Sequence, residues 1–223
     1  MTGRPPALVV IAGTGTEVGK TWTACQVASR LRAQGVAVAA LKPAQSYSPG
    51  EEGSTDAELL AASTGEKATA VCPSWRWYPK AMAAPMAAES LGASPFSLAD
   101  LVAETSWPPT TQVGLVELAG GLGSPQASDG DGVDLVDLFA PELVVLVAAA
   151  GLGTLSHINL ARRALAGRAM DIYLNRLDPA DEVHTANRRW LASATDLSVT
   201  VRPDQLVAAI REGPWRGGRS GTT

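Results

Sequence analysis

A glycine-rich loop near the N-terminus constrains the fold most strongly. The string Gly13-Thr-Gly-Thr-Glu-Val-Gly-Lys-Thr21 lies between an apolar segment and a segment of helical pattern. Glycines let a backbone fold around an anion with its N–H groups pointing inward, and the following helix N-terminus adds positive potential. Lys20 can reach the terminal phosphates of a nucleotide, and the Thr21 hydroxyl can ligate Mg²⁺. The loop is therefore predicted to bind a nucleoside triphosphate.

Short apolar segments alternate with helical patterns along the chain. The predicted strands are Ala7–Ala12, Val36–Leu41, Val113–Leu118, Leu143–Ala149, Asp171–Asn175 and Leu197–Val201. The predicted helices are Lys20–Gln34, Asp56–Ser63, one that begins at Ser97, one that contains Arg162 and Arg163, and Ala180–Ala192. Apolar strands that alternate with helices indicate a mostly parallel central sheet with helices on both faces, in an α/β fold of three layers. We expect one domain over residues 1–212 and a disordered tail, rich in glycine and arginine, over 213–223.

The end of the second predicted strand argues against a dinucleotide-binding fold. That fold requires the spacing G-x-G-x-x-G and an acidic residue after the second strand. Here Gly13, Gly15 and Gly19 are spaced one residue too widely, and Lys42-Pro43 follows the second strand. A lysine at this edge of a parallel sheet favours a second anionic group beside the phosphate loop.

Composition narrows the possible partners. The net charge of −4 argues against nucleic acid or an anionic membrane as the main partner, because both require many basic residues. The two cysteines and two histidines have no metal-ligand spacing, and no secretory signal is recognised, so we expect a cytoplasmic protein. The uncharged segment Leu143–Ala161 contains glycines and polar residues, which indicate a strand, a turn and a helix rather than a membrane span. The acidic stretch Asp129–Asp134 lacks the ligand spacing of an EF-hand and is interpreted as a solvated turn.

These motifs resemble the dethiobiotin synthetase family, ATP-dependent enzymes of biotin synthesis within the P-loop NTPase superfamily. The family loop is G-T-x-T-E-V-G-K-T, and Gly13–Thr21 matches it, including one residue more than the strict phosphate-loop pattern. The other matching segments are Lys42-Pro43, Asp56 at the start of a helix, Ala84–Ala88, Val116-Glu117 with Ala119–Gly121, Gly151–His157, and Asn175 at the end of a strand. The resemblance covers most of the chain and implies a P-loop NTPase fold.

The resemblance implies a cyclo-ligase that uses ATP and Mg²⁺. In such enzymes carbon dioxide adds to one amine of 7,8-diaminononanoate, ATP phosphorylates the carbamate, and the second amine closes a cyclic urea. The partners implied are these small molecules, together with a second copy of the chain in a homodimer with composite sites.

The same resemblance assigns roles to individual residues. The implied catalytic residues are Lys20, Lys42, Thr16 and Ser46, and the implied metal ligands are Thr21, Asp56 and Glu117. The implied nucleotide-binding residues are Gly13, Thr14, Gly15, Thr16, Glu17, Val18, Gly19, Lys20, Thr21 and, against the adenine, Asn175. The implied substrate-binding residues are Lys42, Ser46, Gly151, Leu152, Gly153, Thr154 and Ser156. Asp56 would equally suit the first turn of a helix, where a carboxylate complements the helix dipole.

Three positions depart from the family pattern. Leu118 and Tyr47 stand where the family has glycines, and Ser156 replaces an asparagine. We predict that the bulk of Leu118 and Tyr47 occupies space that the diamine needs. Three alternatives therefore stay open: a related ligase for another amine or acid, a degenerate nucleotide-binding paralogue, and a ParA-like ATPase switch. The last would carry a second lysine early in the loop, where this chain has Thr14-Gly15-Thr16.

Overall fold

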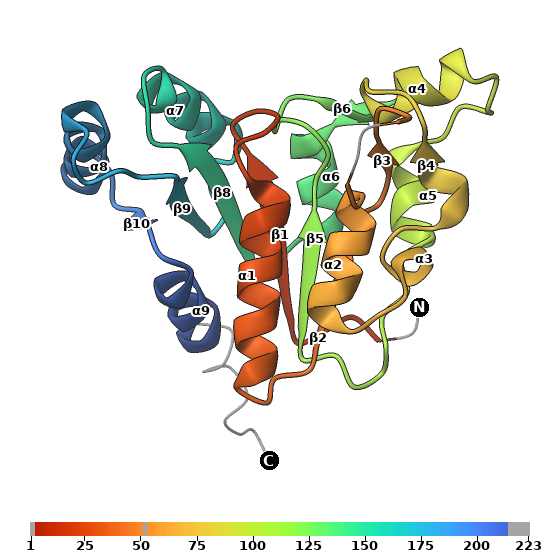
Figure 1. The fold of residues 1–223 in the computed structure, drawn as a ribbon, viewed down its shortest axis with the longest axis horizontal. Helices are drawn as coiled ribbons and strands as arrows, with labels where there is room; N and C mark the ends of the chain where they lie inside the picture. The colour runs from red at the N-terminus through yellow and green to blue at the C-terminus, as the bar shows by residue number, and fades with distance from the viewer. Residues whose placement is uncertain (1–2, 51–52, 214–223) are drawn as a thin grey trace.

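The computed structural model describes residues 3–50 and 53–213, and its centre is a parallel sheet. Six strands lie side by side in the order β10-β9-β8-β1-β5-β2 (Figure 1). Every pairing in this sheet is parallel. The strands are β1 (Ala7–Gly13), β2 (Val38–Leu41), β5 (Val113–Glu117), β8 (Leu143–Ala149), β9 (Met170–Asn175) and β10 (Ser198–Thr200). The predicted parallel α/β sheet is confirmed.

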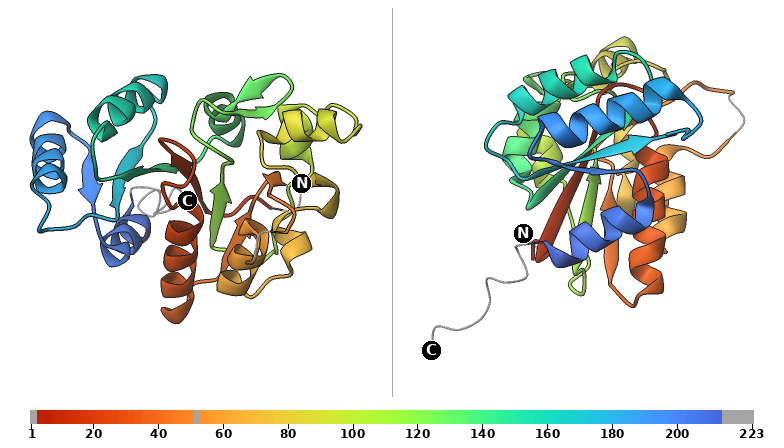
Figure 2. Two further views of the ribbon diagram at one scale, coloured as in Figure 1. Left: turned by 45° about the horizontal axis from the view of Figure 1, so that its top comes forward. Right: turned by 90° about the vertical axis from the view of Figure 1, so that its left-hand side faces the viewer.

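Helices cover both faces of this sheet, because successive strand side chains point to opposite sides. In β1, Leu8 and Val10 belong to one core, whereas Val9 and Ile11 belong to the other. The first core is closed by α6 (Gly132–Phe139), α7 (Thr154–Ala164) and α8 (Glu182–Ala194). The second is closed by α1 (Lys20–Ala33), α2 (Asp56–Thr64) and α9 (Pro203–Glu212), as the side view in Figure 2 shows. The three predicted layers are thus present.

Several smaller elements lie beyond the carboxyl ends of the main strands, whereas α3 (Ala68–Val71) packs beside α2 and β2 (Figure 1). Strand β3 (Gln45–Ser46) pairs in parallel with β4 (Trp77–Tyr78), and β6 (Pro125–Ala127) pairs antiparallel with β7 (Gly130–Asp131). The remaining helical segments of the described chain are η1 (Ser74–Arg76), α4 (Ala84–Ser90) and α5 (Leu98–Ala103). These additions lengthen the chain between β2 and β8 and surround one end of the sheet.

Local capping explains several helix starts. Thr55 and Glu58 form a reciprocal capping box at α2, and Ser97 and Asp100 form another at α5, as the sequence predicts. The interpretation of Asp129–Asp134 as a solvated turn is wrong in part, because the Asp131 carboxylate caps α6 by accepting from the backbone N–H groups of Val133 and Asp134. Helix α9 was not predicted, although Pro203 at its first position is a helix-start signal.

Two further predictions concern a membrane span and the C-terminal tail. None of the helices in the described part of the chain is both long and apolar enough to cross a membrane. The predicted tail lies, apart from Gly213, outside the described residues.

Candidate active site

The glycine-rich loop follows β1 at the carboxyl edge of the sheet. Gly19 has a φ of 95°, in the left-handed region that favours glycine, and a side chain there would collide with the amide of Asn175. The Asn175 amide, at the end of β9, donates through Nδ2 to the carbonyl of Val18 over 2.9 Å. The end of one strand therefore holds the loop that follows another.

A second loop packs closely against the first. A Cβ on Gly121 would lie 3.1 Å from the Gly15 Cα atom, so a larger residue would push the two loops apart. The backbone N–H of Leu122 also donates to the carbonyl of Gly13 over 2.8 Å. The Ala119–Gly121 segment that the sequence singled out thus supports the glycine-rich loop.

Lys20 is buried at the start of α1. Its Nζ donates to the carbonyl of Gly15 over 3.0 Å. Burial, reinforced by the nearby Lys42 ammonium, lowers the pKa of Lys20 to about 8, against the opposing effect of Glu117 and Asp56. An anion bound beside this ammonium would favour its charged form and so oppose the effect of burial on its pKa.

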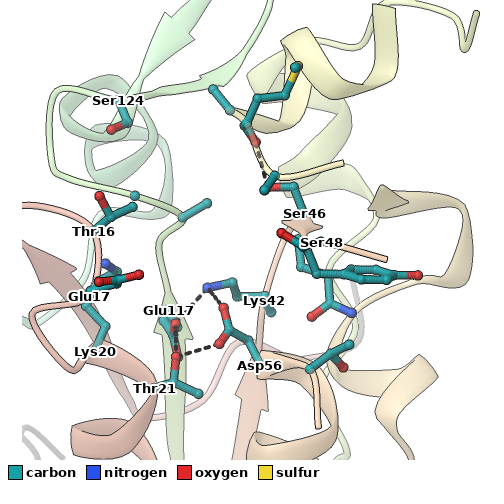
Figure 3. Close-up of a pocket in the computed structure, with 18 of the residues that line it drawn as sticks. Thr16, Glu17, Lys20, Thr21, Lys42, Ser46, Ser48, Asp56, Glu117 and Ser124 are labelled. Carbon is teal, nitrogen blue, oxygen red and sulfur yellow. Dashed lines mark hydrogen bonds and ion pairs between the residues drawn. The ribbon is translucent and has the colours of Figure 1, made fainter. Parts of the chain in front are cut away.

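Four polar side chains from four different elements meet next to Lys20 (Figure 3). Lys42, which follows β2, places its Nζ 2.6 Å from Glu117 Oε1 and 2.7 Å from Asp56 Oδ2. The hydroxyl oxygen of Thr21 lies 2.8 Å from both Asp56 Oδ1 and Glu117 Oε1. Lys42 and Glu117 are nearly inaccessible, with 2% and 1% of their surface exposed. We call Thr21, Lys42, Asp56 and Glu117 the charged cluster.

Two carboxylates share one lysine in this cluster, and their pKa values respond differently. Burial alone would lower the pKa of Lys42, but the carboxylates of Glu117 and Asp56 outweigh it and raise that pKa above its usual range. Burial would raise the pKa of Asp56, yet contacts with Lys42 and Thr21 lower it. Burial and the neighbouring Asp56 charge raise the pKa of Glu117. A further cation near Glu117 would therefore stabilise its charged form.

The donor set of the charged cluster fits Mg²⁺. Glu117 Oε2 is buried and has no hydrogen-bond partner in the described structure, so one carboxylate oxygen is available for a further ligand. Residues 3–50 and 53–213 contain no group of three or more His, Cys, Asp or Glu side chains arranged around a metal. Mg²⁺ does not need one, because it is bound through one or two carboxylates and takes its other ligands from phosphates and water. Thr21, Asp56 and Glu117, the predicted metal ligands, lie together.

A cavity of about 750 Å³ opens over this cluster. One side, the nucleotide wall, consists of the glycine-rich loop and the charged cluster. The opposite side, the outer wall, consists of β3 with Tyr47 and Ser48 and of residues 81–83. Ser46 Oγ donates to the carbonyl of Met82 over 2.6 Å and joins these two segments. The predicted residues Thr16, Glu17, Gly19, Lys20, Thr21, Lys42, Ser46, Asp56 and Glu117 all line this cavity.

The predicted substrate turn lies elsewhere. None of the residues Gly151, Leu152, Gly153, Thr154 and Ser156 lines the cavity of its own chain. Leu152 is 89% exposed, whereas Thr154 Oγ1 is buried without a hydrogen-bond partner among the described residues. The Asn187 amide donates to the carbonyls of Ala150 and Gly151 and holds the turn in place. Within one chain, the structure separates this turn from the charged cluster.

The prediction for Leu118 is wrong, and that for Tyr47 remains a prediction. The Leu118 side chain is fully buried in the core closed by α6 and does not line the cavity, so it takes no space from a ligand. Tyr47 does line the cavity, on the outer wall.

Sequence reasoning missed other cavity residues. Gln45 Oε1 accepts from the backbone N–H of Ala57, and Ser124 Oγ accepts from the backbone N–H of Gly121. Arg176 also lines the cavity. Its position directly after Asn175, an implied nucleotide-binding residue, was the sequence signal that could have identified it.

A strand, a glycine-rich loop ending in Gly-Lys-Thr and a helix, with carboxylates at the ends of neighbouring elements, define a P-loop nucleotide-binding protein. The model of a family described as "AAA domain" matches residues 8–200. The chain belongs to the ATP-dependent dethiobiotin synthetase family, as its similarity to members of that family shows.

Two of these relatives illustrate the similarity. The ATP-dependent dethiobiotin synthetase of Caulobacter vibrioides is 36% identical over 167 residues, which cover 73% of this chain and 75% of the relative. That of Anaeromyxobacter dehalogenans is 38% identical over 179 residues, covering 77% of this chain and 78% of the relative. Among solved structures, a plasmid partition protein from Borrelia burgdorferi has a TM-score of 0.55 at 12% identity, covering 94% of this chain and 97% of the other. At that identity the likeness supports the fold alone.

Proposed function

We propose that this chain forms dethiobiotin from 7,8-diaminononanoate, carbon dioxide and ATP, as an ATP-dependent cyclo-ligase of biotin biosynthesis. The observation that carries the proposal is the charged cluster beside Lys20. The cavity over it, with a volume of about 750 Å³, has room for the phosphates of a nucleotide and a second ligand. The names of the relatives point to ATP and to dethiobiotin as product, and the family resemblance of the sequence implies the diamine and carbon dioxide.

The nucleotide wall supplies the charge for phosphoryl transfer. Backbone N–H groups of Gly13–Thr21, with Thr14 and Val18 among them, would hold the phosphates at the N-terminus of α1. Lys20 would exchange its bond to the Gly15 carbonyl for a phosphate oxygen. Thr21, Asp56 and Glu117 would hold Mg²⁺, which would supply positive charge beside the terminal phosphates. Asn175, as the resemblance implies, would contribute near the adenine.

Lys42 would serve the other substrate. Its ammonium lies between the phosphate loop and the outer wall, where a carbamate formed on the diamine would meet the transferred phosphoryl group. A buried positive charge there stabilises the negative charge that develops in the transition state. Thr16 and Ser46 lie on opposite sides of the same space and would position the reacting groups.

The outer wall suits an aliphatic diamine. Ala81, Met82 and Ala83 offer apolar surface for a hydrocarbon chain, whereas Ser46 and Ser48 provide hydroxyls. Holding both amines in one place makes ring closure intramolecular, for which effective molarities reach ~10⁵–10⁸ M. A related ligase for another amine remains the second candidate, because the Tyr47 side chain adds bulk to this wall.

The proposal includes a homodimer with composite sites. Leu152 in the Gly151–Ser156 turn and Leu160 on α7 are exposed apolar residues, and the unpartnered Thr154 hydroxyl lies at the N-terminus of α7. A partner's turn facing the cavity would present backbone N–H groups to the distal carboxylate of the substrate. Light scattering should give a dimer mass; a 23 kDa monomer with full activity would contradict this part of the proposal. A cytoplasmic location also belongs to the proposal, because both cysteines are free thiols.

The decisive experiment measures ATP turnover with bicarbonate and diamine supplied singly and together. The proposal expects phosphate release and dethiobiotin formation that depend on both substrates. Turnover with bicarbonate and a different amine, but not with the diamine, would favour the related ligase. ATP binding without turnover on any amine would favour the degenerate paralogue.

A further inference from the structure

Arg176 is a cavity residue for which the proposed reaction has so far no role. It follows Asn175, the last residue of β9, and lines the same cavity as Lys20 and the charged cluster. The residue is exposed, and its side chain forms no hydrogen bond or ion pair within the described structure. A guanidinium in such a position is available to a ligand.

The backbone of Arg176 is held in an unfavourable conformation. Its φ is 55°, and only Glu17, Ala140 and Arg176 combine a side chain with a left-handed backbone in the described chain. The first and last of these line the cavity. Non-glycine residues in this region are strained and persist where the surrounding structure holds them, frequently at binding sites.

The Asn175 side chain connects Arg176 to the phosphate loop, which contains the other strained residue, Glu17. The backbone N–H of Arg176 donates to Asn175 Oδ1 over 3.0 Å, while Asn175 Nδ2 donates to the carbonyl of Val18, next to Glu17. The position of Arg176 is therefore coupled to the conformation of the loop. An interaction that needs Arg176 beside the loop would account for the retained strain.

The other charged groups of the cavity indicate which ligand Arg176 would bind. Its fellow cation Lys42 is already paired with Asp56 and Glu117, and Lys20 donates to the Gly15 carbonyl. Glu17, the exposed carboxylate of the loop, forms no ion pair with Arg176. A magnesium–ATP complex is still anionic, and a guanidinium offers five donors that match phosphate oxygens.

We propose that Arg176 binds the phosphate chain of ATP, as a cation supplied from the end of β9 in addition to Lys20. The inference rests on the proposed function in taking ATP as the ligand, and it extends that function by adding a nucleotide-contacting residue. Because the guanidinium would contact phosphate and not the base, ligands without a base should depend on it equally.

The test compares Arg176→Gln, Arg176→Asn and the unmodified protein. Affinities are measured for magnesium complexes of a non-hydrolysable ATP analogue and of inorganic tripolyphosphate, by displacement of a fluorescent ATP analogue. Hydrogen bonds to charged groups contribute enough that both substitutions should weaken both ligands by about 10–100-fold. Asparagine tolerates the left-handed backbone, so Arg176→Asn should melt at the same temperature as the unmodified protein or higher. Arg189→Gln, an exposed arginine on α8 that does not line the cavity, is the matched control and should bind normally.

Several results would overturn the inference. Unchanged affinities in Arg176→Gln, or a loss for the ATP analogue but not for tripolyphosphate, would exclude a phosphate contact. An equal loss of affinity in Arg189→Gln would show that the change in net charge, and not a contact of Arg176, causes the effect. If the unmodified protein binds neither ligand, the proposed function fails together with this inference. If it binds both and the Arg176 variants bind as well, only this inference fails.

Discussion

The two walls of the cavity are built differently. The nucleotide wall stands on the main sheet: its loop follows β1, Lys42 follows β2, and Glu117 ends β5, and each of these strands pairs with a neighbour over four or more residues. The outer wall stands on the two-residue strands β3 and β4 and on residues 81–83, which Ser46 holds through a single hydrogen bond. Lys42 and Glu117 in the first wall are buried, whereas Ser46, Tyr47 and Ser48 in the second are half-buried.

Of the three positions that depart from the family pattern, only Tyr47 lies on a wall of the cavity. The loop Gly13–Thr21 and the charged cluster keep the family's residues, while Tyr47 stands on the outer wall. Buried charges tolerate no loss of a partner, because an unpaired charge costs about 3–5 kcal/mol. A substitution at Lys42 or Glu117 is therefore expected to lower stability, whereas one at the half-buried Tyr47 is not.

The largest effect is expected on the nucleotide wall. Replacing Lys20 with alanine removes the cation that the proposed function places next to the phosphates, and turnover should fall by about 10²–10³-fold. The structure buries Lys20, and its Nζ donates to the Gly15 carbonyl. Burial disfavours this ammonium, so the variant should unfold at a similar denaturant concentration. Steady-state kinetics at saturating ATP provide the measurement; unchanged turnover would contradict the phosphate-loop assignment.

Leu118 tests whether bulk after β5 affects the substrate or the core. Because its side chain is fully buried, Leu118→Ala should lower the free energy of unfolding by about 2–5 kcal/mol. The KM for the diamine should not change. Leu138→Ala, on the exposed side of α6, is the control and should shift stability by less than about 0.5 kcal/mol. Urea unfolding measures both variants, and faster ligation by Leu118→Ala would revive the steric interpretation.

Tyr47 tests the outer wall directly. If the ring occupies space that the diamine needs, Tyr47→Gly should raise kcat/KM for the diamine by up to ~10²-fold, because small misplacements of reacting groups are costly. The KM for ATP should stay the same, since Tyr47 is not part of the loop. Tyr47→Phe retains the bulk and should behave like the unmodified protein. Equal rates in all three proteins would show that the wall already accommodates the diamine.

The smallest expected effect is the uptake of a proton when ATP binds. The lowered pKa of Lys20, about 8, means that the amine is protonated at pH 7 and increasingly neutral above pH 8. Bound phosphate favours the ammonium, so binding should take up a proton above pH 8, and affinity should fall by at most about tenfold per pH unit. Calorimetry in buffers of different ionisation enthalpy counts this proton. Lys20→Arg, whose guanidinium stays charged, should bind without uptake; continued uptake in that variant would assign the proton elsewhere.

Much of this site followed from local sequence patterns. The glycine loop, the strand ends at Lys42 and Glu117, and the capping box before Asp56 are each recognisable within a few residues. Parallel strands end at one edge of a sheet, which explains why residues so distant in sequence were expected together. The burial of Leu118 was open to the same kind of reasoning, because Leu118 follows Val116 at the two-residue spacing of a strand and packs in the same core.

The sequence by itself determined the class of fold, the phosphate loop and the residue types around it, since backbone freedom, charge and strand periodicity act over short distances. Only the tertiary structure decided that Lys42 bridges Asp56 and Glu117, that Asn175 holds both Val18 and Arg176, and that the Gly151–Ser156 turn stands apart from its own cavity. These contacts join residues up to 157 positions apart. They depend on strand order and on how side chains pack once the sheet has formed, and no local pattern encodes either.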